Sequence, residues 1–243
     1  LQEVSGKLTE LLEKLDSVSE DEKVMALLTF LKGDPEAYGE FFSEPVKVTT
    51  EAVYPIENYG SAMTPFYTIL AIWVGGTVLV ALIKVKAEPR GLEHVKSYHL
   101  YFGRYLLFFV MGQVQAAVIV LGDIYLLGCQ ILHPGLFWLV ASLASFTFTV
   151  FIYSLALAFG DIGKALAVVI MVIQIVGSGG TFPIELLPEI YRNIYIFFPF
   201  PYAINAMRET IGGMYGDFYV KNLAQLLIFA VVGLLIGLVI RLP

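Results

Sequence analysis

The sequence predicts an all-α polytopic membrane protein, a helix bundle with five transmembrane spans and a re-entrant pair of short helices, preceded by a short extracellular helical segment. Its composition is one reason: 58% of the residues are hydrophobic and only 15% are charged, whereas about a quarter of the residues of an average soluble protein are charged. The second reason is that five separated apolar stretches approach the ~20 residues that a helix needs to cross a hydrocarbon core. The predicted spans are Ala62–Ile83, Tyr105–Leu127, Pro134–Gly160, Ala165–Phe182 and Asn222–Ile240.

Residues 1–60 are predicted to form an extracellular helical tail and linker, and residues 61–243 a transmembrane domain. The first 60 residues hold thirteen Asp and Glu against five Lys, whereas the rest of the chain is slightly basic. Apolar residues recur at helical spacing within residues 8–18 and 24–31, which predicts two amphipathic helices. Such apolar faces need a partner, so we expect this segment to be the end of a larger extracellular domain. The chain begins at Leu1 without a basic leader region, which is typical of a segment of a longer protein.

The orientation follows from the basic residues of the short loops, because Lys and Arg are retained on the cytoplasmic side. The loop Lys84–Arg104 holds five of them and is predicted to be cytoplasmic. The link Cys129–Pro134 has none and is predicted to lie outside, and Arg241 places the C-terminus inside. The same orientation puts residues 1–60 outside the cell.

Small and polar residues share single faces of the second and third spans. In lipid, helices associate through such residues and through interhelical hydrogen bonds. These faces therefore indicate either helix contacts or the lining of a pathway, and the sequence leaves both open. For Asp123 the alternatives are a polar gate, because an acidic group inside a span is costly, and a solvated helix end. The candidate residues are Gln115, Asp123, Ser145 and Thr149.

The segment 177–221 between the last two spans is interrupted by glycine and proline. It shows two short apolar helical patterns, neither of which is long enough to cross a bilayer. We predict that these helices enter and leave the membrane on the outer side, because non-helical backbone at depth is tolerated where protein or a watery cavity covers it. A surface loop with interfacial helices is one alternative, and a sixth full span through Tyr191–Met207 is another, which the two prolines at its centre disfavour. The residues that mark the breaks are Gly179, Gly180, Pro183, Pro188, Pro199 and Pro201.

The sequence contains no signature of catalysis, of a cofactor or of a metal site. Its glycine-rich run lacks the Lys-Ser/Thr of a phosphate-binding loop, so we do not expect this chain to bind ATP. The single cysteine, Cys129, excludes an intramolecular disulfide, and the three histidines lie apart, without partners at ligand spacing. No basic patch suggests binding to nucleic acid.

Two motifs resemble known families. The segment Pro55–Tyr67, which reads PIENYGSAMTPFY, resembles the hallmark of the phage-infection-protein family (Pip, or YhgE-like) of Gram-positive bacteria, as does the following Trp73-Val74-Gly75. The segments Gly179–Pro183 and Phe198–Ala203, with Arg208, are similar to the re-entrant region of type-2 ATP-binding-cassette (ABC) exporter permeases. The resemblance covers about residues 45–243, and the two families are related.

The resemblance implies a permease-like transmembrane domain, with one more span and a large extracellular domain before Leu1. It also implies that residues 86–101 correspond to the cytoplasmic region that meets an ATPase in exporters. In this sequence the region is basic and amphipathic. The residues expected to contact the ATPase are Arg90, Leu92, Val95 and Lys96.

Two functions therefore compete. In the first, the chain is the membrane subunit of an exporter in the bacterial plasma membrane. It moves a bulky or amphiphilic molecule outward, a separate ATPase docks at residues 91–98, and two copies form a homodimer around the path. In the second, the chain displays an extracellular domain that serves as a phage receptor or secretion accessory, and the bundle is its anchor.

Overall fold

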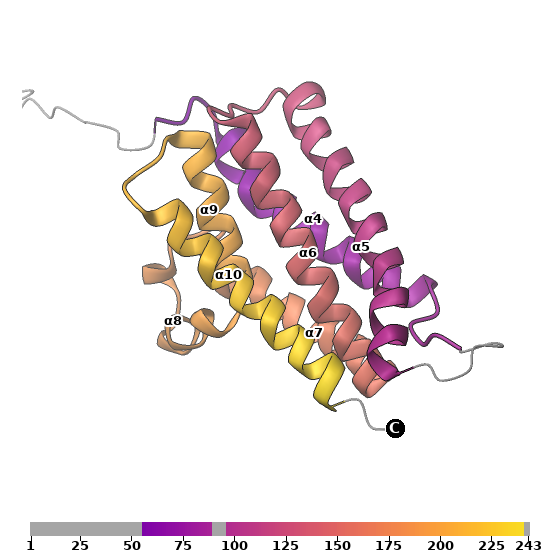
Figure 1. Cartoon of the computed structure of the whole chain (residues 1–243). Coiled ribbons are helices and arrows are strands. Elements are labelled where there is room, and N and C mark those ends of the chain that lie inside the picture. The colour runs from indigo at the N-terminus through magenta and orange to yellow at the C-terminus, as the bar shows by residue number, and fades with distance from the viewer. Residues whose placement is uncertain (1–54, 89–95, 241–243) are drawn as a thin grey trace, which may run out of the picture. The chain divides into compact units, whose positions relative to one another are not determined.

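The computed structural model of the chain describes residues 55–88 and 96–240. All regular structure in these residues is helical, and no strand occurs among them (Figure 1), so the predicted all-α bundle is confirmed. The amphipathic helices predicted within residues 8–31 lie outside the described residues, as do Arg90, Leu92 and Val95.

The described residues contain five helices of 17 or more residues. They are α4 (Tyr59–Leu82), α5 (Ser97–Leu121), α6 (Pro134–Phe159), α7 (Asp161–Gly177) and α10 (Phe218–Leu235). Two shorter helices, α8 (Glu189–Ile194) and α9 (Phe200–Gly212), lie between α7 and α10. Single turns of other helix types complete the fold: the π-helical η1 (Gly122–Leu126) and η4 (Ile236–Ile240), and the 3-10 turns η2 (Ile184–Leu186) and η3 (Tyr195–Phe197).

Among the described residues, four helices are long and apolar enough to cross a membrane: α4, α5 with η1, α6, and α10 with η4. The fourth predicted span, α7, begins four residues before the expected start because Gly160, at φ +61°, turns the chain directly from α6 into α7. It ends at Gly177, before the expected Phe182. Its 17 residues reach about 25 Å, at the short end of the range for a span. A membrane crossing by α7, in addition to these four, therefore stays a prediction.

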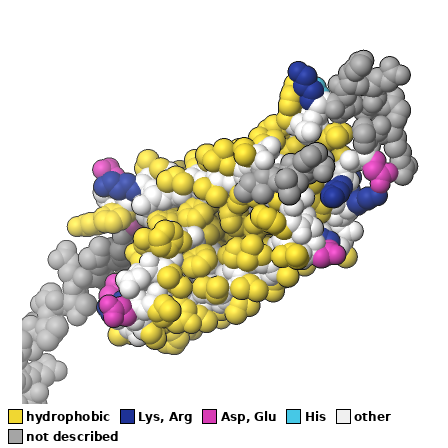
Figure 2. Space-filling view, turned by 90° about the horizontal axis from the view of Figure 1, so that it is seen from below, with side chains coloured by type: hydrophobic (Ala, Val, Ile, Leu, Met, Phe, Trp, Pro, Cys, Tyr) yellow, Lys and Arg dark blue, Asp and Glu magenta, His cyan; other side chains and the backbone are white. Residues whose placement is uncertain are grey.

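The surface of the bundle matches a bilayer. Hydrophobic side chains cover its middle, and the charged side chains gather toward its two ends (Figure 2). On α5, exposed apolar residues recur every three or four positions, as they do on a helix face that contacts lipid: Leu106, Val110, Val114, Val118 and Leu121.

Helix α6 is the centre of the bundle and packs against α4, α5, α7, α9 and α10. One of its buried aromatic partners is Trp73 of α4, which is 0% exposed. The Trp73 ring packs edge-on against Phe148 of α6, with ring centres 5.0 Å apart, and against Phe200 of α9, at 5.5 Å. The indole N–H donates to the carbonyl oxygen of Ala167 in α7, at 3.2 Å. One side chain therefore joins four helices.

Helix α5 begins at Ser97, eight residues before the predicted span, and shortens the predicted Lys84–Arg104 loop. The added turns are held by contacts with α6. The Tyr101 hydroxyl pairs with Ser154 Oγ at 2.7 Å, and the Tyr153 hydroxyl donates to the Tyr101 carbonyl at 3.3 Å. The hydropathy of this basic segment gives no sign of these contacts, because they depend on the neighbouring helix.

The orientation of the bundle can be tested by labelling. We name the end where α4 begins the Tyr59 end; it is predicted to be extracellular. Asp217 lies exposed there, in the link before α10, and Lys86 lies exposed beyond the other end of α4. In a full-length protein with Cys129→Ser and no other cysteine, we expect an impermeant maleimide to label Asp217→Cys in intact cells and to label Lys86→Cys only after permeabilisation. The reverse pattern would show that the orientation is inverted.

Candidate functional site at the Tyr59 end of the bundle

Helix α9 occupies only the half of the bundle nearest the Tyr59 end. Its 13 residues are about 20 Å long. At its start, Phe200 is fully buried against Trp73 in the middle of the bundle. At its end, the carbonyl of Thr210 accepts the N–H of His133, the residue before α6, at 3.0 Å. Helix α9 therefore returns from mid-bundle to the Tyr59 end.

The start of α9 is fixed by a side chain of α7. Helix starts leave backbone N–H groups without intrahelical partners. Pro201 lacks such a group, and the Phe200 N–H donates to Oε1 of Gln174 at 3.1 Å. Gln174 itself is 1% exposed. This glutamine allows a helix to begin inside an apolar bundle.

Arg208 of α9 binds the backbone at the break in the helix after α7. Gly179 adopts φ +67°, which favours glycine. Gly180 lies against the Phe66 ring, where an added Cβ would be 2.3 Å from Cδ2. The Nη2 group of Arg208 donates to the carbonyl oxygens of Gly179, at 2.9 Å, and Gly180, at 3.1 Å, and its Nη1 donates to Oδ1 of Asn205 at 3.2 Å. A single guanidinium thus binds two carbonyls that the broken helix leaves open.

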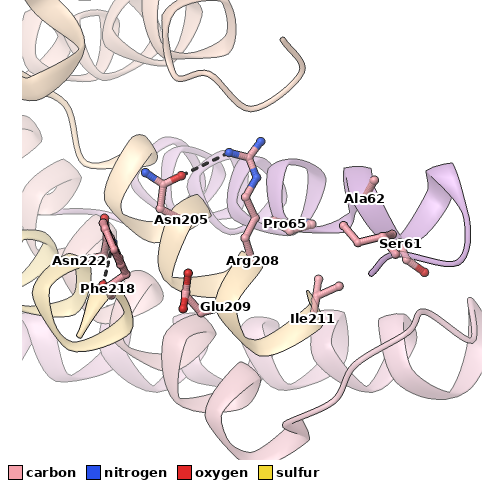
Figure 3. Close-up of a pocket in the computed structure, with 10 residues that line it drawn as sticks. Ser61, Ala62, Pro65, Asn205, Arg208, Glu209, Ile211, Phe218 and Asn222 are labelled. Atoms are coloured by element: carbon pink, nitrogen blue, oxygen red, sulfur yellow. Dashed lines mark hydrogen bonds between the residues drawn. The ribbon is translucent and has the colours of Figure 1, made fainter. Parts of the chain in front are cut away.

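Two cavities meet at Arg208. The first is about 370 Å³ and lies between α4, α9 and the start of α10 (Figure 3). The second is about 570 Å³ and extends along the Ser178–Glu185 segment. Their shared wall consists of Ile56, Ala62, Asn205 and Arg208.

The wall of the first cavity combines polar and apolar groups from three helices. The guanidinium of Arg208 and the carboxylate of Glu209 point in different directions from α9 (Figure 3). Glu209 is 5% exposed, and its Oε2 accepts the Tyr215 N–H at 2.6 Å. The buried Asn222 of α10 contributes an amide, whereas Ile211 and Phe218 contribute apolar surface.

The structure brings some of the predicted break residues together and separates others. Gly179 and Gly180 bind Arg208, and Pro183 lines the larger cavity. Pro199 and Pro201 flank the buried Phe200 at the start of α9. Pro188 lies apart, exposed before α8. The sequence analysis did not identify three cavity residues: Asn205, Glu209 and Asn222. Their polar side chains within an otherwise apolar segment were the signal that could have located them.

The predicted small-polar residues of the spans are placed in helix contacts and away from the cavities at Arg208. Nε2 of Gln115 donates to the Ala71 carbonyl of α4 at 2.9 Å. Thr149 Oγ1 donates to the Ser145 carbonyl at 2.7 Å and shares a hydrogen bond with the Tyr105 hydroxyl at 3.2 Å. The buried Oγ of Ser145 has no hydrogen-bond partner among the described residues. Asp123 is 7% exposed and contacts α4 beside a third cavity.

Of the residues expected to contact an ATPase, only Lys96 is described. It is exposed and directly precedes α5, with its ammonium 5.9 Å from the centre of the Tyr98 ring. Lys84, at the other side of the same loop, pairs with Glu88.

A multi-pass helical bundle with a half-length helix between its last two long helices is the architecture of a type-2 ABC permease-like membrane subunit. The family model described as "ABC-2 family transporter protein" matches residues 11–239, and the chain belongs to this family. It is therefore a multi-pass protein of the plasma membrane.

The chain is also similar to the protein named "Uncharacterized protein YhgE" of Bacillus subtilis (strain 168), with 31% identity over 199 residues. The alignment covers 82% of this chain and 25% of that protein, so the chain spans about a quarter of the length of the curated relative it matches. The resemblance to YhgE-like proteins is thereby confirmed. No solved structure matches the chain.

Proposed function

We propose that the chain is the membrane subunit of an exporter that moves a bulky or amphiphilic molecule outward with a separate ATPase. The observation that supports this proposal is the half-length helix α9, whose Arg208 binds the broken backbone between two cavities. A membrane anchor has no need of such an interruption, whereas a permease needs a part of the bundle that can open.

A broken helix and polar side chains inside a bilayer carry a high free-energy cost, which points to a function for them. Within a bilayer, unsatisfied backbone groups cost several kcal/mol each, and broken helices occur where protein or a watery cavity covers them. Polar and ionisable side chains in such a position are also expensive and are usually functional. Three such side chains line the same cavity: Arg208, Glu209 and Asn222.

The chemistry of the cavity walls favours an amphiphilic substrate. Pro65, Ile211 and Phe218 offer apolar surface to a hydrocarbon portion, and Asn205 and Asn222 offer amide groups to a polar portion. The combined space of the two cavities, which share a wall, exceeds what a single ion requires.

The remaining parts of the proposal come from the family. A separate ATPase would dock at residues 91–98 on the cytoplasmic side, and two copies of the chain would enclose the path. The segment before residue 60 would face the outside, as the basic loops predict.

The proposal can be tested in cells that carry the full-length protein in two altered forms. Replacing Leu92 and Val95 by Asp should abolish ATPase co-purification, because a few apolar anchors carry most interface energy. Arg208→Met should leave the ATPase bound but lower export of an amphiphilic dye at least about tenfold, because charge-assisted hydrogen bonds contribute about 1.5–3 kcal/mol each. Arg192→Met, at an exposed position on α8, is the matched control.

Protein abundance in the membrane should be equal in all variants. If no ATPase co-purifies with the unaltered protein and no variant changes dye accumulation, the export proposal is wrong. Phage adsorption that persists in the same variants would then favour the receptor function.

A further inference from the structure

Asp123 is held in an unusual backbone turn at the Tyr59 end of α5. The π-helical turn η1 follows α5, and in it the Leu127 N–H donates to the Gly122 carbonyl at 2.9 Å. The Cys129 N–H then donates to the Asp123 carbonyl at 3.0 Å. π-helical turns occur frequently at functional sites. This one buries the Asp123 side chain against α4, although both of its neighbours in sequence are more exposed.

Two threonines one turn apart on α4 hold this segment. Thr68 Oγ1 donates to Oδ2 of Asp123 at 2.6 Å, and Thr64 Oγ1 lies 3.1 Å from the Cys129 sulfur and 3.0 Å from the Gly60 carbonyl. Each threonine therefore uses its single hydroxyl hydrogen on a neighbour. What remains on these oxygens is lone pairs, which accept hydrogen bonds.

These groups line a cavity of about 260 Å³ that is distinct from the two at Arg208. Asn58 Oδ1 lies in the same wall, where it accepts the Ser61 N–H at 2.8 Å and keeps a second lone pair. Oδ1 of Asp123 has no hydrogen bond within the described residues. Part of its surface remains accessible, because it is not one of the fully enclosed polar atoms. The residues that line the cavity thus carry a carboxylate oxygen and several further acceptors.

The described residues offer this carboxylate no cationic partner. Within the described residues, no Lys, Arg or His forms an ion pair with Asp123, which is 7% exposed. A buried carboxylate with a single hydroxyl partner is costly unless it takes up a proton or a positively charged guest compensates it.

We propose that this cavity binds a primary ammonium group, carried by a small amine or by the headgroup of an aminolipid. An ammonium has one positive charge and three N–H donors, which match one carboxylate and the acceptor oxygens of Asn58, Thr64 and Thr68. A divalent metal is disfavoured, because the described residues contain no group of three His, Cys, Asp or Glu that could hold one. The volume also admits the carbon atoms attached to the nitrogen.

Cys129 is a built-in reporter, because its sulfur lies in the wall of the same cavity. In the purified full-length protein with any other cysteine replaced by serine, we expect a thiosulfonate bearing an ethylammonium group to modify Cys129 faster than one bearing an ethylsulfonate. Relative to the same ratio for a free thiol, this ratio should be raised on the order of tenfold, because the carboxylate attracts one charge and repels the other. The ratio cancels any change in the reactivity of the sulfur itself.

The isosteric variant Asp123→Asn should bring the ratio close to that of the free reagents, and Asp217→Asn, an exposed carboxylate in another loop of the same end, should leave it unchanged. Methylammonium chloride should protect Cys129 from a neutral thiosulfonate, whereas sodium chloride at the same ionic strength should not. Slower modification of Cys129 in phosphatidylethanolamine vesicles than in phosphatidylcholine vesicles would identify a lipid headgroup as the source of the ammonium. Protection by methylammonium without such a difference between the vesicles would identify a soluble amine.

A rate ratio equal to that of a free thiol with no protection by any amine, or equal protection by sodium, would overturn the proposal. If Cys129 does not react with any reagent, Leu127→Cys in a Cys129→Ser background reports on the same cavity, because Leu127 lines it and is 69% exposed. This site is independent of the proposed export function, since an ammonium can bind whether or not the bundle transports it.

Discussion

Replacement of Gly163 by alanine is expected to destabilise the bundle by about 3 kcal/mol or more, at the upper end of the range for overpacking. Gly163 lies in the first turn of α7, where the chain has just left α6. A Cβ at this position would lie 1.9 Å from the carbonyl oxygen of Leu155 and 3.0 Å from the backbone nitrogen of Ala156. Backbone atoms cannot rotate aside as a side chain can, so α7 would have to move away from α6.

The matched control is Gly103→Ala on α5. Gly103 is exposed, and an added Cβ there meets nothing within 4 Å. Alanine favours the helix more than glycine does, so this variant should be as stable as the unaltered protein or slightly more stable. Unfolding of the full-length protein in mixed micelles, followed by circular dichroism, measures both. Equal midpoints for the two variants would show that α6 and α7 do not approach as closely as the structure indicates.

Replacement of Trp73 by alanine is the second change expected to have a large effect. It removes the ring contacts with Phe148 and Phe200 and the hydrogen bond to Ala167. Loss of a fully buried tryptophan typically costs about 3–5 kcal/mol. In lipid, the loss is mainly one of van der Waals packing, which drives helix association there. Because Trp73 contacts the start of α9, we also expect faster proteolysis between α7 and α9.

Trp138, the other tryptophan of the chain, provides the control. It lies on α6 and is 47% exposed on the outer surface of the bundle. Trp138→Ala should therefore change the unfolding midpoint far less than Trp73→Ala. A further variant, Trp73→Phe, keeps most of the ring volume and loses the indole N–H, so it should fall between the two. A larger loss for Trp138→Ala than for Trp73→Ala would contradict the assignment of the core.

Much of the fold could be predicted from the sequence because the length of an apolar stretch shows directly which segments lie in the hydrocarbon core of a membrane. The apolar stretches located α4, α5, α6 and α10, and the break at Gly177–Gly180 followed by Pro199 and Pro201 located the two short helices. Each of these signals is local: apolar length sets a span, and glycine or proline ends a helix. The predicted boundary differs from the observed one where a distant contact extends the helix, as Tyr101 does at the start of α5.

The candidate site was only partly predictable for the same reason. Gly179 and Gly180 were identified as a break, but nothing in their spacing shows that Arg208, 28 residues later, donates to their carbonyls. The pairing of Asp123 with Thr68 joins residues 55 positions apart. Gln174, whose side-chain Oε1 accepts the first N–H of α9, was absent from the predicted site residues.

The sequence by itself determined that this protein is an all-α membrane bundle, where its long helices run, and which segment interrupts them, because these properties depend on local hydropathy and on the backbone preferences of glycine and proline. Its motifs also indicated the family. Only the tertiary structure decided that α9 begins against Trp73 and Gln174, that two cavities meet at Arg208, and that Asp123 faces a third. Each of these depends on side chains from different helices meeting in space, and a contact of that kind leaves no periodic trace in a single sequence.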